Sequence, residues 1–190
     1  MNNHDDQTVL IVEDETELAE LYADHLADDY RTKIASTSGE ALVSLTSDVD
    51  LVLLDRRLPG MSGDRLLTHI RNWETDCQVI MVTAVDIDSD IIEMPCEGYL
   101  QKPVDKEKLL STVKQAFLIE TYERLIGDYY EARKKYAALK PAVSRGEVDT
   151  ESFEQLETRI EELEVEISRA VDAFPDDELS DAFRGLHCSD

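Results

Sequence analysis

Short apolar runs in this chain repeatedly end on a polar side chain that could do chemistry. The residues at these ends are three acids, a threonine and a lysine: Glu13, Asp14, Asp55, Thr83 and Lys102. Three crowded carboxylates repel one another and raise one another's pKa values unless a cation neutralises them. Mg²⁺ binds one or two such carboxylates and keeps several waters that substrate oxygens can replace. The set therefore predicts a magnesium site, provided that the fold brings these ends together.

Two of these residues suit an anion that sits beside the metal. Lys102 supplies a positive donor, and Thr83 supplies a hydroxyl donor. Asp55 ends an almost wholly apolar run and is followed at once by a turn sequence with Pro59 and Gly60, so it is placed for chemistry rather than for packing. Together the groups could hold a phosphoryl group attached to Asp55 as the nucleophile.

The elements that must position these residues alternate between strands and helices. Apolar runs of strand length occupy residues 9–12, 31–35, 51–55, 78–83 and 98–103, and helical patterns follow at 16–26, 38–45 and 63–73. Thr16 is expected to cap the first of these helices. The alternation indicates βαβ units and a parallel sheet, in which ligands bind outside the carboxyl ends of the strands. The five polar residues would converge along that edge.

From Val104 onward the strand signals stop and helix formers dominate. Asp105 is expected to cap a helix that runs past Gly127 to about Leu139, where Lys140 and Pro141 would end it. A second helix from about residue 150 carries an apolar seam at steps of three and four: Phe153, Leu156, Ile160, Leu163, Ile167 and Val171. The seam needs a partner, either the preceding helix folded back as a hairpin, which the short connection favours, or a second copy.

The charge of the chain restricts its partners. It has 43 acidic and 19 basic residues, a formal net charge of −24, spread along the whole length. This excess opposes nonspecific binding to nucleic-acid phosphates and to anionic lipid. In molar salt a Debye length of about 3 Å would screen the repulsion. We therefore hypothesise a salt-rich cytoplasm, as in a halophile.

Cysteine use and hydropathy indicate the same compartment. Cys77, Cys96 and Cys188 are far apart in the sequence and are expected to be free thiols in a reducing environment. An apolar run of the roughly 20 residues that span a bilayer is missing, and the first residues lack a basic, apolar signal. We expect a soluble, cytoplasmic protein that does not bind membranes.

The polar strand ends lie in motifs that resemble the receiver domain of two-component response regulators over about residues 7–120. The motifs are Glu13-Asp14, Asp55-x-x-Leu58-Pro59-Gly60-Met61-x-Gly63, Thr83-Ala84 and Lys102-Pro103. The resemblance implies a flavodoxin-like, doubly wound α/β fold with a five-stranded parallel sheet in the order 2-1-3-4-5. It also implies that Asp55 accepts a phosphoryl group from a sensor histidine kinase. Such a protein is a phosphoacceptor that takes part in its own phosphorylation and dephosphorylation, rather than an enzyme.

The resemblance also assigns the metal ligands. By the family's pattern Asp14, Asp55 and the carbonyl group of Arg57 would bind Mg²⁺, and Glu13 would bind it through water. The pair Glu13-Asp14 replaces the commoner pair of two aspartates, which changes its reach and keeps its charge.

The remaining roles concern the switch. Thr83 would donate a hydrogen bond to a phosphoryl oxygen, and Lys102 would pair with the acyl phosphate. Tyr99 matches the aromatic residue that moves inward when Thr83 is drawn to the phosphoryl group. The segment between Thr83 and Lys102 is shorter than is usual in the family and contains Pro95, so a fourth helix should be short or irregular. This departure puts the family's usual dimer face in doubt.

The chain after the receiver is similar to the HalX domain, a helical domain attached to receivers in haloarchaea. Residues 121–175 are expected to form this output or dimerisation region, and the acidic tail 176–190 is expected to be disordered. A helix-turn-helix pattern is missing. The basic run Arg133-Lys134-Lys135, with Lys140 and Arg145, is the one place suited to DNA, although a solvated helix face explains it better.

The main hypothesis is a response regulator of a phosphorelay whose helical region acts in transcriptional regulation. One alternative is a phosphorelay intermediate or protein-interaction adaptor without DNA binding. Another is a constitutive homodimer, formed through the C-terminal helices, in which the receiver is passive.

Overall fold

The computed structural model describes residues 7–73, 75, 77–84, 94–145 and 149–174. The chain divides into two compact units, Met1–Ala116 and Phe117–Asp190. Residues 85–93, which belong to the segment predicted to hold a short or irregular fourth helix, lie outside the described residues. The tail predicted to be disordered, 176–190, also lies outside them.

The first unit is built on a five-stranded sheet with the order β2-β1-β3-β4-β5. All neighbouring strands are parallel, which confirms the predicted sheet and its order. The strands are β1 (Thr8–Val12), β2 (Arg31–Ala35), β3 (Leu51–Asp55), β4 (Gln78–Thr83) and β5 (Gly98–Gln101). Every residue of β1 and β3 is buried, as expected for apolar runs without alternation that are covered on both faces.

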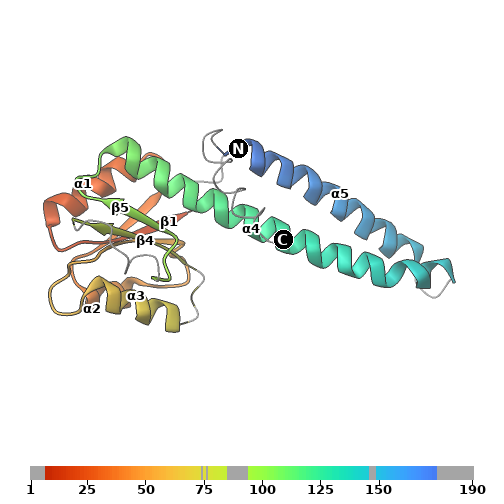
Figure 1. Cartoon of the computed structure of the whole chain (residues 1–190), viewed down its shortest axis with the longest axis horizontal. Helices are drawn as coiled ribbons and strands as arrows, with labels where there is room; N and C mark the ends of the chain where they lie inside the picture. Colours follow the sequence, from red (N-terminus) through yellow and green to blue (C-terminus); the bar gives the residue numbers. More distant parts are fainter. Residues whose placement is uncertain (1–6, 74, 76, 85–93, 146–148, 175–190) are drawn as a thin grey trace, which may run out of the picture. The chain divides into compact units, whose positions relative to one another are not determined.

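Helices cover both faces of this sheet (Figure 1). α1 (Thr16–Leu26) and the first turns of α4 (Lys106–Ser144) lie on one face, and α2 (Ser38–Ser44) and α3 (Gly63–Asn72) lie on the other. Leu10, Val52 and Met81 belong to the core under α2 and α3. The doubly wound architecture is confirmed, and it leaves the carboxyl ends of the strands at one edge.

The starts of two helices test the predicted caps; α4 has a side-chain cap, and α1 has none. Asp105 accepts a hydrogen bond from the Lys108 N–H at 2.8 Å, which confirms the predicted cap of α4. The predicted cap at Thr16 is wrong by one residue. The carbonyl group of Glu15 already accepts the Ala19 N–H at 2.9 Å, so Glu15 is the cap residue and Thr16 is the first residue of α1.

The second unit is a hairpin in which α4 and α5 (Thr150–Asp172) run side by side (Figure 1). Its core consists of buried Leu125, Ala132, Ile160, Leu163 and Ala170. Tyr136 stacks on Phe153 with ring centroids 5.0 Å apart. The α5 seam therefore packs against α4 of the same chain, as the short connection suggested.

α4 extends beyond its predicted end. It continues to Ser144 with Pro141 inside it, so the prediction that Lys140 and Pro141 end the helix is wrong. Proline removes one N–H donor, but its fixed φ is helical, and one lost hydrogen bond in the last turn is a small part of a 39-residue helix. α4 runs unbroken through residue 120, so no change of secondary structure marks the domain boundary predicted there. That boundary stays a prediction.

Glycine is required where α3 starts beside the end of β3. A Cβ atom on Gly63 would overlap the Asp55 carbonyl oxygen and lie 2.8 Å from the Arg56 Cα. The Gly63 N–H donates to the Arg56 carbonyl group at 3.0 Å, which fixes this close approach. The position of Asp55 therefore depends on a residue without a side chain.

Among the described residues, no helix combines the length and the apolar character that crossing a membrane requires.

We predict that Gly63→Ala lowers the free energy of unfolding of the first unit by about 2 kcal/mol, because backbone atoms must move to admit the methyl group. The midpoint of denaturant unfolding, followed by the fluorescence of the single tryptophan Trp73, measures this change. Gly127→Ala is the matched control, since a Cβ atom there meets nothing within 4 Å. This control should stabilise α4 by about 0.5–1 kcal/mol, seen by circular dichroism. Equal effects of both substitutions would contradict the argument.

A second prediction concerns the hairpin. Leu163 is 1% exposed, so Leu163→Ala should lower the free energy of unfolding of the hairpin by about 2–4 kcal/mol through the lost contacts and the cavity left behind. Val165→Ala, at a side chain that is 50% exposed, should change it by less than about 0.5 kcal/mol. Helix content against denaturant measures both. A similar loss in the two variants would show that the seam is not the core.

Candidate functional site

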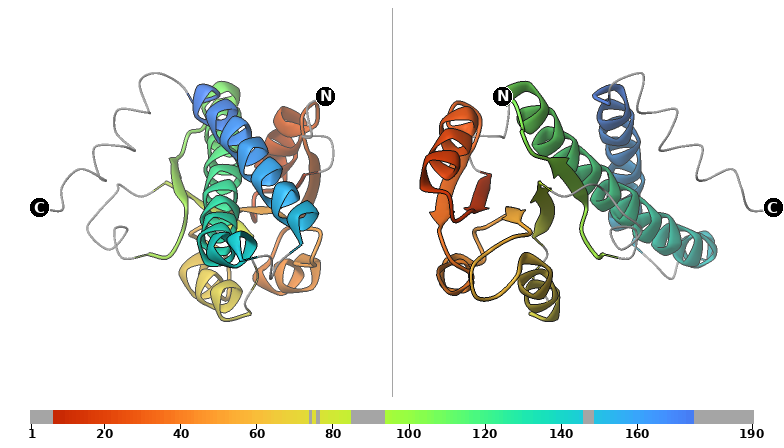
Figure 2. Two further views of the ribbon diagram at one scale, coloured as in Figure 1. Left: turned by 90° about the vertical axis from the view of Figure 1, so that its right-hand side faces the viewer. Right: turned by 60° about the vertical axis from the view of Figure 1, so that its left-hand side comes forward.

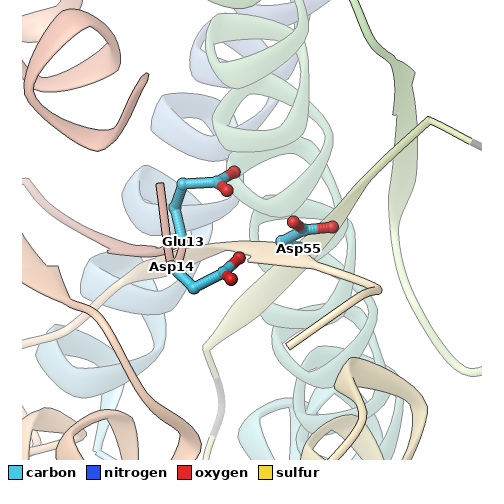
Figure 3. A group of neighbouring side chains, drawn as sticks. All are labelled: Glu13, Asp14 and Asp55. Atoms are coloured by element: carbon cyan, nitrogen blue, oxygen red, sulfur yellow. The ribbon is translucent and has the colours of Figure 1, made fainter. Parts of the chain in front are cut away.

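Three carboxylates meet at the carboxyl edge of the sheet. Glu13 and Asp14 follow β1, and Asp55 is the last residue of β3, the neighbouring strand. One oxygen of each lies within 4.8 Å of the others. Figure 3 shows the side chains of Glu13 and Asp14 extending toward that of Asp55. The parallel pairing of β1 and β3 thus brings together acids that are about 40 positions apart in sequence, as parallel strand ends do.

The ammonium group of Lys102 bridges two of these acids. Its Nζ atom donates to Glu13 Oε2 at 2.7 Å and to Asp55 Oδ2 at 2.9 Å. Lys102 directly follows β5, and its N–H donates to the Thr83 carbonyl group at 2.8 Å. The last strand in the order is therefore tied to the acids of β1 and β3.

Burial makes these charges strongly interacting. Glu13 is 2% exposed and Asp55 is 5% exposed. Burial raises the pKa of Glu13, and the nearby Asp55 raises it further, although the Lys102 hydrogen bond partly offsets this. Burial alone would lower the pKa of Lys102, but its hydrogen bonds to Glu13 and Asp55 outweigh burial and raise it. Lys102 is thus held as a cation between two carboxyl groups.

Backbone donors hold Asp55 in the same place. Asp55 Oδ1 accepts the Arg57 N–H at 2.9 Å. The Arg56 N–H donates to the Val82 carbonyl group at 3.1 Å, which anchors the start of the loop to β4. The Arg56 side chain pairs with Asp64 at 3.1 Å, while the Arg57 side chain is exposed. The predicted role of Arg57 as a metal ligand concerns its carbonyl group and stays a prediction.

Thr83 and Tyr99 lie on one face of the sheet near the site. Thr83 ends β4 and is 1% exposed. Met81 pairs with Tyr99, and Thr83 pairs with Gln101, so by strand alternation the Thr83 side chain shares its face with the half-buried Tyr99. Burial, with a hydrogen bond to Cys96, raises the pKa of Tyr99. Tyr99 packs against the core under α2 and α3.

One polar group near the site escaped the sequence analysis. Tyr22 of α1 is 1% exposed, and its hydroxyl group has no hydrogen-bond partner among the described residues. Burial raises its pKa, and the charges of Lys102, Glu13 and Asp55 are close enough to act on it. In the sequence Tyr22 is one residue of an apolar helix stripe, and this pattern does not show where its hydroxyl group lies.

The donor set fits Mg²⁺. Glu13, Asp14 and Asp55 offer only oxygen ligands, and hard divalent cations prefer carboxylate oxygens. Asp14 is exposed and the other two are buried, so a cation would have both a solvent side and a protein side. Three carboxylates beside a single lysine leave an excess of negative charge that a divalent cation would neutralise.

Two family models match the chain. A response regulator receiver domain matches residues 9–114, and a HalX domain matches residues 118–183.

Two curated relatives are described as transcriptional regulators. A Haloferax volcanii protein, described as a candidate transcriptional regulator, is 35% identical over 168 residues, which are 87% of this chain and 29% of that protein. The transcriptional regulatory protein CitT of Halalkalibacterium halodurans is 30% identical over 173 residues, which are 86% of this chain and 68% of CitT. The chain thus spans less than a third of the first relative and about two thirds of the second.

Solved structures resemble the first unit. The response regulator TrrA of Thermotoga maritima, crystallised with Mg²⁺ and BeF, has a TM-score of 0.52 and 30% identity, covering 58% of this chain and 98% of TrrA. A CheY-like receiver domain from Methanospirillum hungatei has a TM-score of 0.53 and 29% identity, covering 57% and 91%. With the family match over more than half its length, the chain belongs to the response regulators of two-component systems, with a receiver domain followed by a HalX domain.

Proposed function

We propose that this response regulator accepts a phosphoryl group on Asp55 from a sensor histidine kinase, with Mg²⁺, and passes the change to a helical region that acts in transcriptional regulation. One observation carries the proposal. Asp55 lies 2.9 Å from the Lys102 ammonium group, within a cluster of three carboxylates that each have one oxygen within 4.8 Å of the others. This arrangement supports the proposal, because a candidate nucleophile, a cation for the product and oxygen ligands for a metal lie together.

The transfer requires one bond to form and one to break. A carboxylate oxygen of Asp55 attacks the phosphorus atom of a phosphohistidine, and the P–N bond breaks with its electron pair going to the imidazole nitrogen. Asp55 becomes an acyl phosphate and carries additional negative charge. The Lys102 ammonium group, already in hydrogen-bond contact with Asp55, would stabilise that charge.

Three carboxylates would hold the metal, together with the Arg57 carbonyl group: Glu13 through water, and Asp14 and Asp55 directly. When bound, Mg²⁺ supplies neutralisation of charge on the phosphoryl oxygens. These side chains would orient and enclose the phosphoryl group, and Lys102 would offset the negative charge that remains on it.

The switch would use Thr83 and Tyr99. A phosphoryl group on Asp55 would attract the Thr83 hydroxyl group, and Tyr99 shares that face of the sheet one strand away. A shift of Thr83 would let Tyr99 change its packing, which is a local charge change that biases a two-state element. β5 leads through Lys102 directly to the Asp105 cap and α4, so the change would reach the start of that helix.

A second candidate is a phosphorelay intermediate or adaptor without DNA binding. The net charge of −24, which opposes binding to phosphate backbones, favours it. Sequence-specific retention of DNA by the phosphorylated chain at molar salt would count against this candidate. A phosphorylated chain that binds no DNA but still accepts the phosphoryl group would support this candidate.

We predict that Asp55→Asn reduces acid-stable, hydroxylamine-sensitive labelling by acetyl phosphate to below about 1% of the wild-type level, because the nucleophile is gone. Removal of Mg²⁺ by a chelator should reduce the labelling of the wild-type chain at least about tenfold. Mass spectrometry of the intact chain measures both effects.

The control for this experiment is Asp24→Asn, an exposed acid of α1 outside the cluster, which should label normally. Unchanged labelling of the Asp55→Asn variant would refute the assignment of the phosphoacceptor.

A further prediction tests the switch. Beryllofluoride with Mg²⁺, which mimics a phosphoryl group, should change amide hydrogen exchange over Gly98–Gln101 in the wild-type chain. Thr83→Ala should abolish this change and retain roughly half or more of the labelling at Asp55, because the hydroxyl group acts after the transfer. Thr68→Ala, at an exposed hydroxyl group of α3, should respond like the wild type. A normal exchange response in Thr83→Ala would exclude Thr83 from the switch.

A further inference from the structure

α4 has an exposed apolar stripe on a face that the hairpin does not use. Ile119, Ile126 and Tyr130 are 38%, 39% and 64% exposed. They follow one another at steps of seven and four residues, and the exposed Ala137 continues the series after seven more. At 3.6 residues per turn these positions lie on one line along the helix. The stripe has the spacing of a helix-pairing seam.

This stripe is distinct from the hairpin seam on the same helix. The residues of α4 that contact α5 include Tyr122, Leu125, Tyr129, Ala132 and Tyr136. Their mean direction is about 100° away from that of the stripe, at 100° per residue. α5 therefore covers one side of α4 and leaves the stripe available.

Charge is distributed unevenly along this part of α4. Residues 117–130 contain three acids and one base: Glu120, Glu123, Asp128 and Arg124. Residues 131–144 contain one acid and four bases: Glu131, Arg133, Lys134, Lys135 and Lys140. The first half is acidic and the second half is basic, in a chain whose overall charge is strongly negative. Two copies aligned in parallel would place like charges together, whereas an antiparallel pair would place opposite charges together.

We propose that this face of α4 binds the same face of a second copy, in an antiparallel pair related by a two-fold axis near position 128. In that register Ile126 faces Tyr130 of the other copy, and Ile119 faces its Ala137. Glu123 then faces Arg133 of the other copy. Apolar positions match apolar positions and acid matches base with one choice of register, as a self-complementary interface requires.

Arg133 is already held beside this face. Its guanidinium carbon lies 5.9 Å and 5.7 Å from the ring centroids of Tyr129 and Tyr136. A cation restrained in this way loses less conformational freedom when it meets a carboxylate of the partner. Lys134 likewise lies 5.6 Å from the ring centroid of Tyr130 in the stripe.

The interface would exist whether or not Asp55 accepts a phosphoryl group, because it uses no residue of the phosphoacceptor site. The assembly of the full chain tests the inference separately from the proposed function.

Sedimentation equilibrium of the full chain should give twice the 21.5 kDa monomer mass. Ile126→Glu should weaken association about a hundredfold, because each pair would place two new carboxylates against apolar side chains. Val165→Glu, at a 50% exposed apolar residue of α5 outside the stripe, should leave the dissociation constant unchanged. Circular dichroism should show the same helix content in all three proteins, since both positions are exposed in the single chain.

Charge reversal tests the antiparallel register. At the lowest salt concentration that keeps the chain folded, Glu123→Arg should weaken association about tenfold, because two arginine pairs replace two ion pairs. The double variant Glu123→Arg, Arg133→Glu should restore the wild-type dissociation constant. In a parallel pair each residue would face its own copy, so Glu123→Arg would have little effect.

A monomeric wild-type chain at all concentrations would overturn the proposal. A dimer that Ile126→Glu leaves intact would place the interface elsewhere and would also overturn it. Weakening by Glu123→Arg without rescue in the double variant would reject the antiparallel register.

Discussion

Mutual repulsion among three acids at one edge of the sheet is the constraint on which the first unit depends. Glu13 and Asp55 are almost wholly buried, and with Asp14 their oxygens lie within 4.8 Å of one another. Burial makes such charges costly unless they are paired. The Lys102 ammonium group, 2.7 Å and 2.9 Å from Glu13 and Asp55, offsets that cost. Because Lys102 follows β5, the charge balance of the site also holds the far strand in position.

Much of this arrangement could be predicted from sequence, because it depends on patterns that are local. The runs that became β1 and β3 are apolar without alternation, which indicates strands covered on both faces. Parallel strands place their carboxyl ends together, so the meeting of Glu13, Asp55 and Lys102 followed from topology alone. The α5 seam likewise indicated a partner helix, and the short connection favoured the α4 of the same chain.

The features that could not be predicted depend on distances between elements. The need for a bare backbone at Gly63 arises from its approach to the Asp55 carbonyl group, which spacing along the chain does not reveal. The buried hydroxyl group of Tyr22 reflects how α1 sits on the sheet. Pro141 remained helical because a long helix tolerates one missing donor near its end, although the local rule for proline indicated a stop.

Because Lys102 contacts both Glu13 and Asp55, the site should tolerate replacement of Asp55 better than replacement of Lys102. Replacing Asp55 by a neutral residue leaves the ammonium group 2.7 Å from Glu13, so these two charges stay paired. Replacing Lys102 leaves two carboxylates that are 2% and 5% exposed without their cation. A gene copy that no longer needed the phosphoacceptor role proposed for Asp55 would therefore lose the aspartate more readily than the lysine. Among diverged copies, chains with the lysine and no aspartate should outnumber chains with the reverse pattern.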